Sequence, residues 1–148
     1  MAATIKTPEE QQLMRAAGKA AASVLEYITP HVKPGMTTDQ INTLCHEYIV
    51  DELGLIPAPL GYGEGPGRPP FPKSVCTSVN HVVCHGIPGD KSLKKGDIVN
   101  VDVTVIKDGY HGDTSKMFIV GEGSPEDNRL CRITQEALYV GLKKVKPG

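Results

Sequence analysis

The sequence predicts an α+β fold in which an antiparallel or mixed sheet is covered by helices. Three observations predict it: two amphipathic helical segments in the first third of the chain, a β-hairpin pattern over residues 98–115, and a further helical segment near the end. The order helix, helix, strands, hairpin, helix is that of helices packed on an antiparallel sheet.

Length and composition indicate one soluble globular domain. A chain of 148 residues is the size of an ordinary domain, so residues 1–148 are expected to form a single domain. A net charge of −1 and few aromatic residues give no signal for binding nucleic acid or an anionic membrane. The chain has no apolar run of transmembrane length, and its start, MAATIKTPEE, lacks the apolar region of a signal peptide. The four scattered cysteines are therefore expected to be reduced thiols of a cytoplasmic protein.

The first helix is expected to begin after Thr7 and to end at Ile28. Thr7 can cap it, Pro8 suits the first helical position, and Glu10 can close a capping box. One apolar face recurs at helical spacing: Leu13, Ala16, Ala17, Ala20, Val24, Leu25 and Ile28.

The second helix is expected over residues 37–54. Thr37 and Gln40 form a second plausible capping box, and Gly54 is a stop signal. Its apolar stripe consists of Ile41, Leu44, Cys45, Tyr48 and Ile49.

A long loop and short strands follow. Residues 56–72 are so rich in proline and glycine that a loop is expected, and long loops in compact domains are often functional. The segments SVCTS (74–78) and HVVCHGI (81–87) are typical of short strands, and SLKKGD (92–97) of a turn.

The third helix is expected to begin after Ser124 and to carry the stripe Leu130, Ile133, Ala137, Leu138 and Leu142. The sequence Val-Lys-Pro-Gly follows the first helix at 32–35 and the third at 145–148. This repeat suggests a duplicated architecture of which the chain contains the first half.

The hairpin contains two carboxylates whose position calls for an explanation. Because side chains alternate along a strand, Asp102 and Thr104 share a face, and so do His111, Asp113 and Ser115. A two-residue turn at Asp108-Gly109 places the two carboxylates diagonally on one face, and a turn at 107–108 places them directly opposite. Only a loop of odd length or a bulge separates them.

Like charges that face each other destabilise a sheet unless something neutralises them. A divalent cation is the simplest such partner, because carboxylates are hard oxygen ligands. Two alternatives stay open: that Asp102 and Asp113 are a solvated hairpin residue and a turn cap, or that they share a proton. A calcium loop is excluded, because Thr104, Ile106 and Lys107 stand where it needs two oxygen ligands and a glycine.

His85 lies near the end of the second of the short strand segments. A histidine at a strand end is either a hydrogen-bonded structural residue or a catalytic one, and the spacing does not distinguish the two. A structural zinc site needs closely paired ligands, and this spacing is absent among Cys76, Cys84, His81 and His85, so the thiols are expected to be buried and inert.

Three segments resemble type I methionine aminopeptidases of the bacterial kind: PKSVCTSVNHVVCHGIP, GDIVNVDVTVIKDGYHGDTSKMF, and the stretch from IKTPEE to VKPG. The resemblance covers nearly the whole chain and implies the first half of a pita-bread fold, whose two pseudo-symmetric α+β halves enclose a two-metal centre. It implies removal of the N-terminal methionine from nascent proteins in the cytoplasm, with two divalent ions (Co, Mn, Fe or Zn) as cofactors.

Residue by residue, the resemblance makes Asp102 a metal ligand and Asp113 a ligand that bridges both metals. It makes His85 the catalytic histidine that contacts the substrate, and it places Tyr62 and Phe71 around the methionine side chain. From their shared strand face, His111, Thr104 and Ser115 are expected to support the ligands.

The chain departs from the family pattern in two ways. The loop 61–72 is several residues longer and has Pro59 where many members have cysteine. In addition, the family takes a histidine and two glutamates as further metal ligands from the second half, which is absent from this chain.

Three hypotheses follow for this half: part of a methionine aminopeptidase, a non-catalytic binding module on the same fold, or a symmetric dimer that presents four carboxylates. The complete enzyme is expected to be a monomer that meets nascent polypeptides at the ribosome, without nucleic-acid or membrane contacts of its own.

Overall fold

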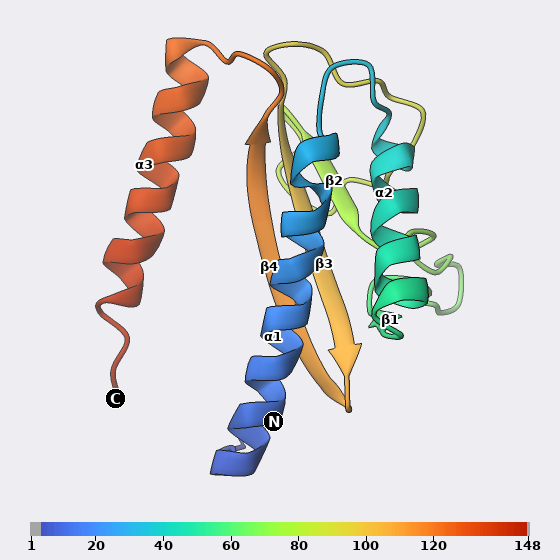
Figure 1. The fold of residues 1–148 in the computed structure, drawn as a ribbon, viewed down its shortest axis with the longest axis vertical. Coiled ribbons are helices and arrows are strands. Elements are labelled where there is room, and N and C mark those ends of the chain that lie inside the picture. Colours follow the sequence, from blue (N-terminus) through green and yellow to red (C-terminus); the bar gives the residue numbers. More distant parts are fainter. Residues whose placement is uncertain (1–3, 148) are drawn as a thin grey trace.

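The computed structural model describes residues 4–147, and the described elements run helix, helix, strands, hairpin, helix, as predicted (Figure 1). The helices are α1 (Pro8–Ile28), α2 (Thr38–Glu47) and α3 (Pro125–Leu142), with a short 3-10 turn, η1 (Thr29–His31), and a π-helical turn, η2 (Tyr48–Glu52). The strands are β1 (Ile56–Pro57), β2 (Cys76–Val79), β3 (Ile98–Lys107) and β4 (Tyr110–Ile119).

Both predicted capping boxes at the start of the chain are confirmed. The Thr7 hydroxyl accepts a hydrogen bond from the Glu10 amide at 3.2 Å, and the Glu10 carboxylate accepts one from the Thr7 amide at 2.8 Å. Thr37 and Gln40 make the same pair of bonds at the start of α2. Amide groups that would otherwise lack partners are thus satisfied where each helix begins.

The sheet is antiparallel and centred on β3. One edge of β3 pairs with β4 along its whole length, while β2 and β1 pair with successive parts of its other edge. The hairpin turn is Asp108-Gly109, with φ of 51° and 80°, which is the positive-φ geometry of a type I′ turn. The predicted turn is confirmed, and Asp113 lies opposite Thr104.

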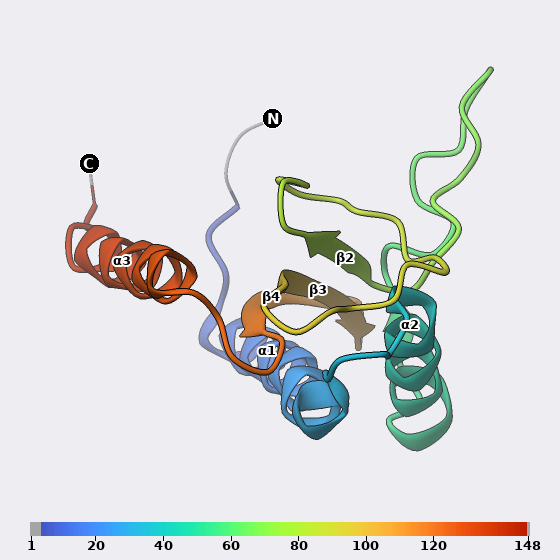
Figure 2. The ribbon, with the colours of Figure 1, turned by 90° about the horizontal axis from the view of Figure 1, so that it is seen from above.

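The core lies between one face of this sheet and helices α1 and α2 (Figure 2). Alternate β3 residues are fully buried on that face: Val99, Val101, Val103 and Val105. Helix α1 covers them with Ala17, Ala21, Val24, Leu25 and Ile28, whereas Leu13 near its start is exposed. Gly112 of β4 lies where α1 crosses most closely, because a Cβ built there would be 2.0 Å from the Ala17 carbonyl oxygen. The opposite face of the sheet is left open for the site.

Two strand predictions were wrong. Residues 81–87 form no strand, because Asn80 adopts φ 54° and turns the chain away as β2 ends. The Asn80 side chain holds this turn by accepting from the Ile98 amide at 3.0 Å and donating to Asp97 at 2.9 Å. Conversely, the first two residues of the predicted loop pair with β3 as β1.

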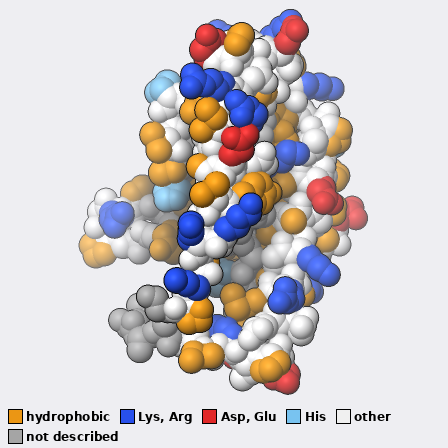
Figure 3. All heavy atoms as spheres, turned by 90° about the vertical axis from the view of Figure 1, so that its left-hand side faces the viewer, with side chains coloured by type: hydrophobic (Ala, Val, Ile, Leu, Met, Phe, Trp, Pro, Cys, Tyr) orange, Lys and Arg blue, Asp and Glu red, His pale blue; other side chains and the backbone are white. Residues whose placement is uncertain are grey.

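Helix α3 forms as predicted. Its Ser124 cap is confirmed, because the Ser124 hydroxyl accepts a hydrogen bond from the Asp127 amide at 3.1 Å. None of its residues is buried, and both ribbon views show it standing apart from the sheet (Figures 1 and 2). The amphipathic pattern therefore predicted the helix, but no residue of its apolar stripe is buried among residues 4–147. Figure 3 shows hydrophobic side chains interspersed with lysines and arginines on the side of the molecule where α3 lies. No helix in the described part of the chain is long and apolar enough to cross a membrane.

Candidate functional site

A hollow of about 490 Å³ opens on the sheet face that the helices leave uncovered. It brings together the five residues expected in the site: Tyr62, Phe71, His85, Asp102 and Asp113. Six further residues complete its lining: Ala58, Pro59, Cys76, Ile87, Thr104 and His111.

The two carboxylates come from adjacent strands and share the open face. Asp102 pairs with Ser115 and Asp113 with Thr104, so the two aspartates are diagonal neighbours on one face. Diagonal neighbours across an antiparallel pair lie about 7–8 Å apart, so their side chains can both reach a cation between them. Asp113 is exposed and Asp102 is half-buried at the floor of the hollow.

The electrostatics of Asp102 are those of a carboxylate that lacks a neutralising partner. Burial raises the pKa of Asp102, the negative charge of Asp113 raises it further, and His85 lowers it. A divalent cation between the aspartates would remove the repulsion, so both residues fit a hard metal ion as oxygen ligands. Among residues 4–147, however, no group of three or more His, Cys, Asp or Glu side chains is placed to hold a metal ion.

His85 reaches the hollow from an irregular segment rather than from the end of a strand. Its φ of 54° lies in the left-handed region, and the next residue, Gly86, is held against β2. The Gly86 carbonyl accepts from the Thr77 amide at 2.8 Å, and the Gly86 amide donates to the Ser78 hydroxyl at 3.1 Å. These two bonds position the histidine beside Asp102.

Tyr62 and Phe71 belong to the base of the long loop, which rises on the open side of the sheet (Figure 2). The Phe71 amide donates to the Tyr62 carbonyl and the Gly61 amide to the Phe71 carbonyl, both at 2.9 Å. This closes the loop into a narrow hairpin, and Tyr62 is 76% exposed at the rim. The loop thus supplies one aromatic wall of the hollow.

The other lining residues were only partly foreseen. Thr104 and His111 were expected from their strand face, but Ser115 is not part of the lining and instead accepts from Asn100 at 3.3 Å. Cys76 was not expected in the site, although its position opposite Asp102 follows once β2 is paired with β3.

The expectation of buried, inert thiols is confirmed for Cys76 and wrong for Cys84. Burial, together with the nearby negative charges of Asp102 and Asp113, raises the pKa of Cys76 to about 11, so its thiol stays protonated near neutral pH. Cys84 is exposed, because the segment that carries it loops away from the sheet.

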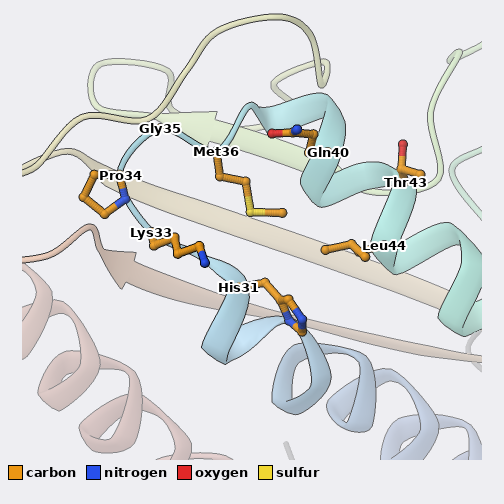
Figure 4. Close-up of a pocket in the computed structure, with 8 residues that line it drawn as sticks. All are labelled: His31, Lys33, Pro34, Gly35, Met36, Gln40, Thr43 and Leu44. Carbon is orange, nitrogen blue, oxygen red and sulfur yellow. The ribbon is translucent and has the colours of Figure 1, made fainter.

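A second hollow of similar volume lies between residues 31–36 and helix α2 (Figure 4). His31 and Lys33 line one side, Gln40 and Leu44 the other, and Met36 lies between them. The Nδ1 atom of the His31 ring forms a hydrogen bond with the Tyr27 carbonyl oxygen at 3.1 Å. This hollow contains no carboxylate and is not the candidate metal site.

Replacing Asp102 with asparagine should stabilise the metal-free chain. Because the folded-state pKa of Asp102 is raised, the folded chain binds this proton more tightly than the unfolded chain. Ionising Asp102 therefore lowers the free energy of unfolding. This loss is absent at low pH, where Asp102 is protonated, and appears as pH rises through the raised pKa. Asp102→Asn should gain about 0.2–1 kcal/mol at pH 7, because asparagine removes the cost of burying the charge and then its repulsion by Asp113, and almost nothing below pH ~4.

Urea denaturation in the presence of a chelator measures this effect at both pH values. Asp51→Asn, at an exposed position away from the hollow, is the matched control. If the Asp102→Asn chain were less stable than the wild type at pH 7, ionised Asp102 would not destabilise the metal-free fold.

Comparison with known proteins gives a consistent result. A model of metallopeptidase family M24 matches residues 12–148. Methionine aminopeptidase of Escherichia coli K12 is 60% identical over 149 aligned residues, covering 100% of this chain and 54% of that protein. The resemblance seen in the sequence is thereby confirmed, and the chain spans about half the length of the curated relatives that it matches.

Solved structures agree with this. A crystal structure of methionine aminopeptidase from Rickettsia prowazekii superposes with a TM-score of 0.91 and 53% identity, covering 98% of this chain and 56% of that one. The crystal structure of methionine aminopeptidase from Thermotoga maritima superposes with a TM-score of 0.88 and 40% identity, covering 98% of this chain and 56% of that one. The α+β class and the likeness to one part of the pita-bread fold are confirmed.

Proposed function

The chain belongs to metallopeptidase family M24, and on that premise we propose that it is the N-terminal half of the catalytic domain of a methionine aminopeptidase. The proposed activity is removal of the N-terminal methionine from nascent proteins by metal-dependent hydrolysis. One observation carries the proposal: a single hollow holds two carboxylates, a histidine and two aromatic side chains.

Asp102 and Asp113 are the proposed metal ligands, with Asp113 shared between two divalent ions (Co, Mn, Fe or Zn). When bound, such ions activate a water molecule and polarise the carbonyl of the scissile amide. The raised pKa of Asp102 supports this role, because burial and then the charge of Asp113 disfavour the ionised carboxylate, which a bound cation would stabilise. In the family, the remaining ligands come from the second half of the fold.

The other residues of the hollow act on the substrate. Tyr62 and Phe71 offer an aromatic wall for the apolar methionine side chain, a surface on which a thioether packs favourably. The proposed catalytic role of His85 is to donate a hydrogen bond to the oxygen that gains negative charge during hydrolysis. Its position beside Asp102 supports this role.

A second candidate function is a binding module without catalysis. It concerns the described residues 4–147 alone, in which no group of three or more His, Cys, Asp or Glu side chains is placed to hold a metal ion. Such a module would hold the first residue of a peptide in the same hollow and release it unchanged.

Methionine release distinguishes the two. The chain is incubated with a Met-Ala-Ser peptide and Co²⁺, Mn²⁺, Fe²⁺ or Zn²⁺, and free methionine is measured beside an Asp102→Asn chain. The aminopeptidase proposal expects release that requires a metal and falls at least about 100-fold in the variant, as for loss of a group that acts in the transition state. Release that persists with a chelator or in Asp102→Asn would contradict it.

Metal binding gives a readout that does not depend on turnover. Both candidate functions expect titration with Mn²⁺, followed by calorimetry, to show binding that weakens in Asp102→Asn and in Asp113→Asn. Binding of Mn²⁺ without methionine release would mean that this chain alone is not a competent enzyme and that the proposed activity belongs to the complete fold.

The proposed substrates, cellular location and oligomeric state follow from the proposed activity. We infer that the substrates are the N-termini of nascent polypeptides, met in the cytoplasm at the ribosome, and that the complete enzyme acts as a monomer.

A further inference from the structure

The loop that supplies the aromatic wall is exposed along most of its length, so its position depends on how its two ends are held. Between residues 61 and 70 every residue except Gly65 is exposed. The end that precedes the loop is tied to the sheet, because the Ala58 amide donates to the Thr104 carbonyl at 2.9 Å. The other end passes through Pro72 toward β2, and both ribbon views show the loop beside helix α2 (Figures 1 and 2).

Helix α2 holds this second end through three side chains on one of its faces. Asp39, Asn42 and His46 are three and four residues apart, which is the spacing of neighbours on a helix face. Asn42 Oδ1 accepts a hydrogen bond from the Ser74 amide at 2.8 Å, and His46 Nδ1 forms one with the Ser74 hydroxyl at 2.7 Å. Asp39 forms an ion pair with Lys73. Together these contacts form the α2 anchor.

The two bonds to Ser74 are the important part of the α2 anchor. Ser74 is only 2% exposed, and it lies in a segment that belongs to neither a helix nor a strand. A buried amide and a buried hydroxyl both need partners, and here side chains of α2 provide them. The side chains of the Lys73–Asp39 pair are 28% and 45% exposed, so this ion pair contributes little.

The position of Ser74 is transmitted to the hollow through a stiff connection. Phe71 lies three residues before Ser74 and Cys76 two residues after it, and both line the hollow. Between Phe71 and Ser74 stands Pro72, whose ring fixes its own φ at about −65° and confines the preceding residue to an extended conformation. A displacement of Ser74 therefore moves Phe71, because few soft dihedral angles separate them.

We propose that Asn42 and His46 are positioning residues: by holding Ser74, they fix Phe71 as a wall of the hollow that neither of them lines. The importance of this wall for a methionine side chain rests on the proposed function, whereas the position of Phe71 does not.

Fluorine NMR of the metal-free chain labelled with 4-fluorophenylalanine tests the proposal. The sequence contains two phenylalanines, so two resonances are expected, and Phe71→Leu assigns them by removing one. Phe118 is buried in the core and serves as the internal reference. Asn42→Leu and His46→Leu, which each remove a partner of Ser74, should shift or broaden the Phe71 resonance and leave that of Phe118 in place.

Conservative variants separate the hydrogen bonds from the packing of α2. Asn42→Asp keeps an oxygen that accepts from the Ser74 amide, and His46→Asn keeps a polar atom where Nδ1 lies, so both should restore the Phe71 resonance. Ile41→Val instead truncates a fully buried residue of the same helix. It should lower the urea midpoint and leave the Phe71 resonance unchanged.

Three results would overturn the proposal. The first is a Phe71 resonance that does not move in either leucine variant. The second is a movement that Asn42→Asp and His46→Asn do not reverse. The third is an equal movement in Ile41→Val, which would mean that any loosening of α2 displaces Phe71.

Addition of Mn²⁺ and L-methionine to the labelled wild-type chain tests the proposed function separately. A saturable shift of the Phe71 resonance is expected, with a dissociation constant about 3- to 10-fold higher in Asn42→Leu. Any methionine release by that variant should show a raised KM with little change in kcat, as for loss of binding that substrate and transition state share. If the leucine variants behave as expected but methionine leaves Phe71 unaffected, the positioning role is supported and the methionine-binding role of the hollow is wrong.

Discussion

Gly112→Ala is expected to lower the free energy of unfolding by at least about 3 kcal/mol. A Cβ at this position would lie 2.0 Å from the Ala17 carbonyl oxygen and 2.7 Å from the Gly18 amide nitrogen, both in the backbone of α1. No rotamer change can relieve a backbone contact, so the helix must move off the sheet or β4 must bend. Because a domain of this size is stabilised by only about 5–15 kcal/mol, this is a large part of the total.

Urea denaturation measures the loss, and Gly18→Ala is the matched control. A Cβ at Gly18 meets nothing within 4 Å, and alanine is the better helix former by about 1 kcal/mol, so this variant should be more stable than the wild type. If Gly112→Ala unfolded at the same urea concentration as the wild type, the close crossing of α1 over β4 would be wrong.

Gly86→Ala is expected to displace His85 from the hollow while the rest of the fold persists. The added Cβ would lie 2.1 Å from the Thr77 carbonyl oxygen, in the backbone of β2. Residues 85–87 must then move away from this strand, and the 2.8 Å bond from the Thr77 amide to the Gly86 carbonyl is lost. Any methionine release should fall about 100-fold, because a misplacement of 1 Å has an effect of that size.

Two measurements separate this effect from general destabilisation. Hydrogen exchange at the Thr77 amide should accelerate, and the imidazole resonances of His85 should shift, whereas the amides of β3 should stay protected. Gly89→Ala is the control in the same segment, since a Cβ there meets nothing within 4 Å. Unchanged protection of Thr77 in Gly86→Ala would show that the segment is not held as described.

The parts of the fold that were predictable from sequence are those with local signals. Asp108-Gly109 identifies the hairpin turn, and the period-two alternation of β3 then decides that Asp102 and Asp113 share a face. The two predicted capping boxes and the Ser124 cap locate the start of each helix, because they depend on residues only three positions apart.

What the sequence did not predict depends on contacts between distant segments. HVVCHGI has the composition of a strand, but Asn80 turns it away and Gly86 brings it back to β2, so Cys84 is exposed. In the same way, periodicity identified the apolar stripe of α3 without showing what covers it. The membership of Cys76 in the site follows only from the pairing of β2 with β3.

The tight turn at Asp108-Gly109 also bears on the time course of folding. A hairpin with a two-residue loop forms in about 1–10 µs, since almost no chain has to be closed before its strands pair. Tyr62, Phe71 and His85 reach the hollow through pairings between segments that are far apart in sequence, which form more slowly. We therefore expect the two aspartates to be the first members of the site to meet as the chain folds, with the aromatic wall and the histidine added later.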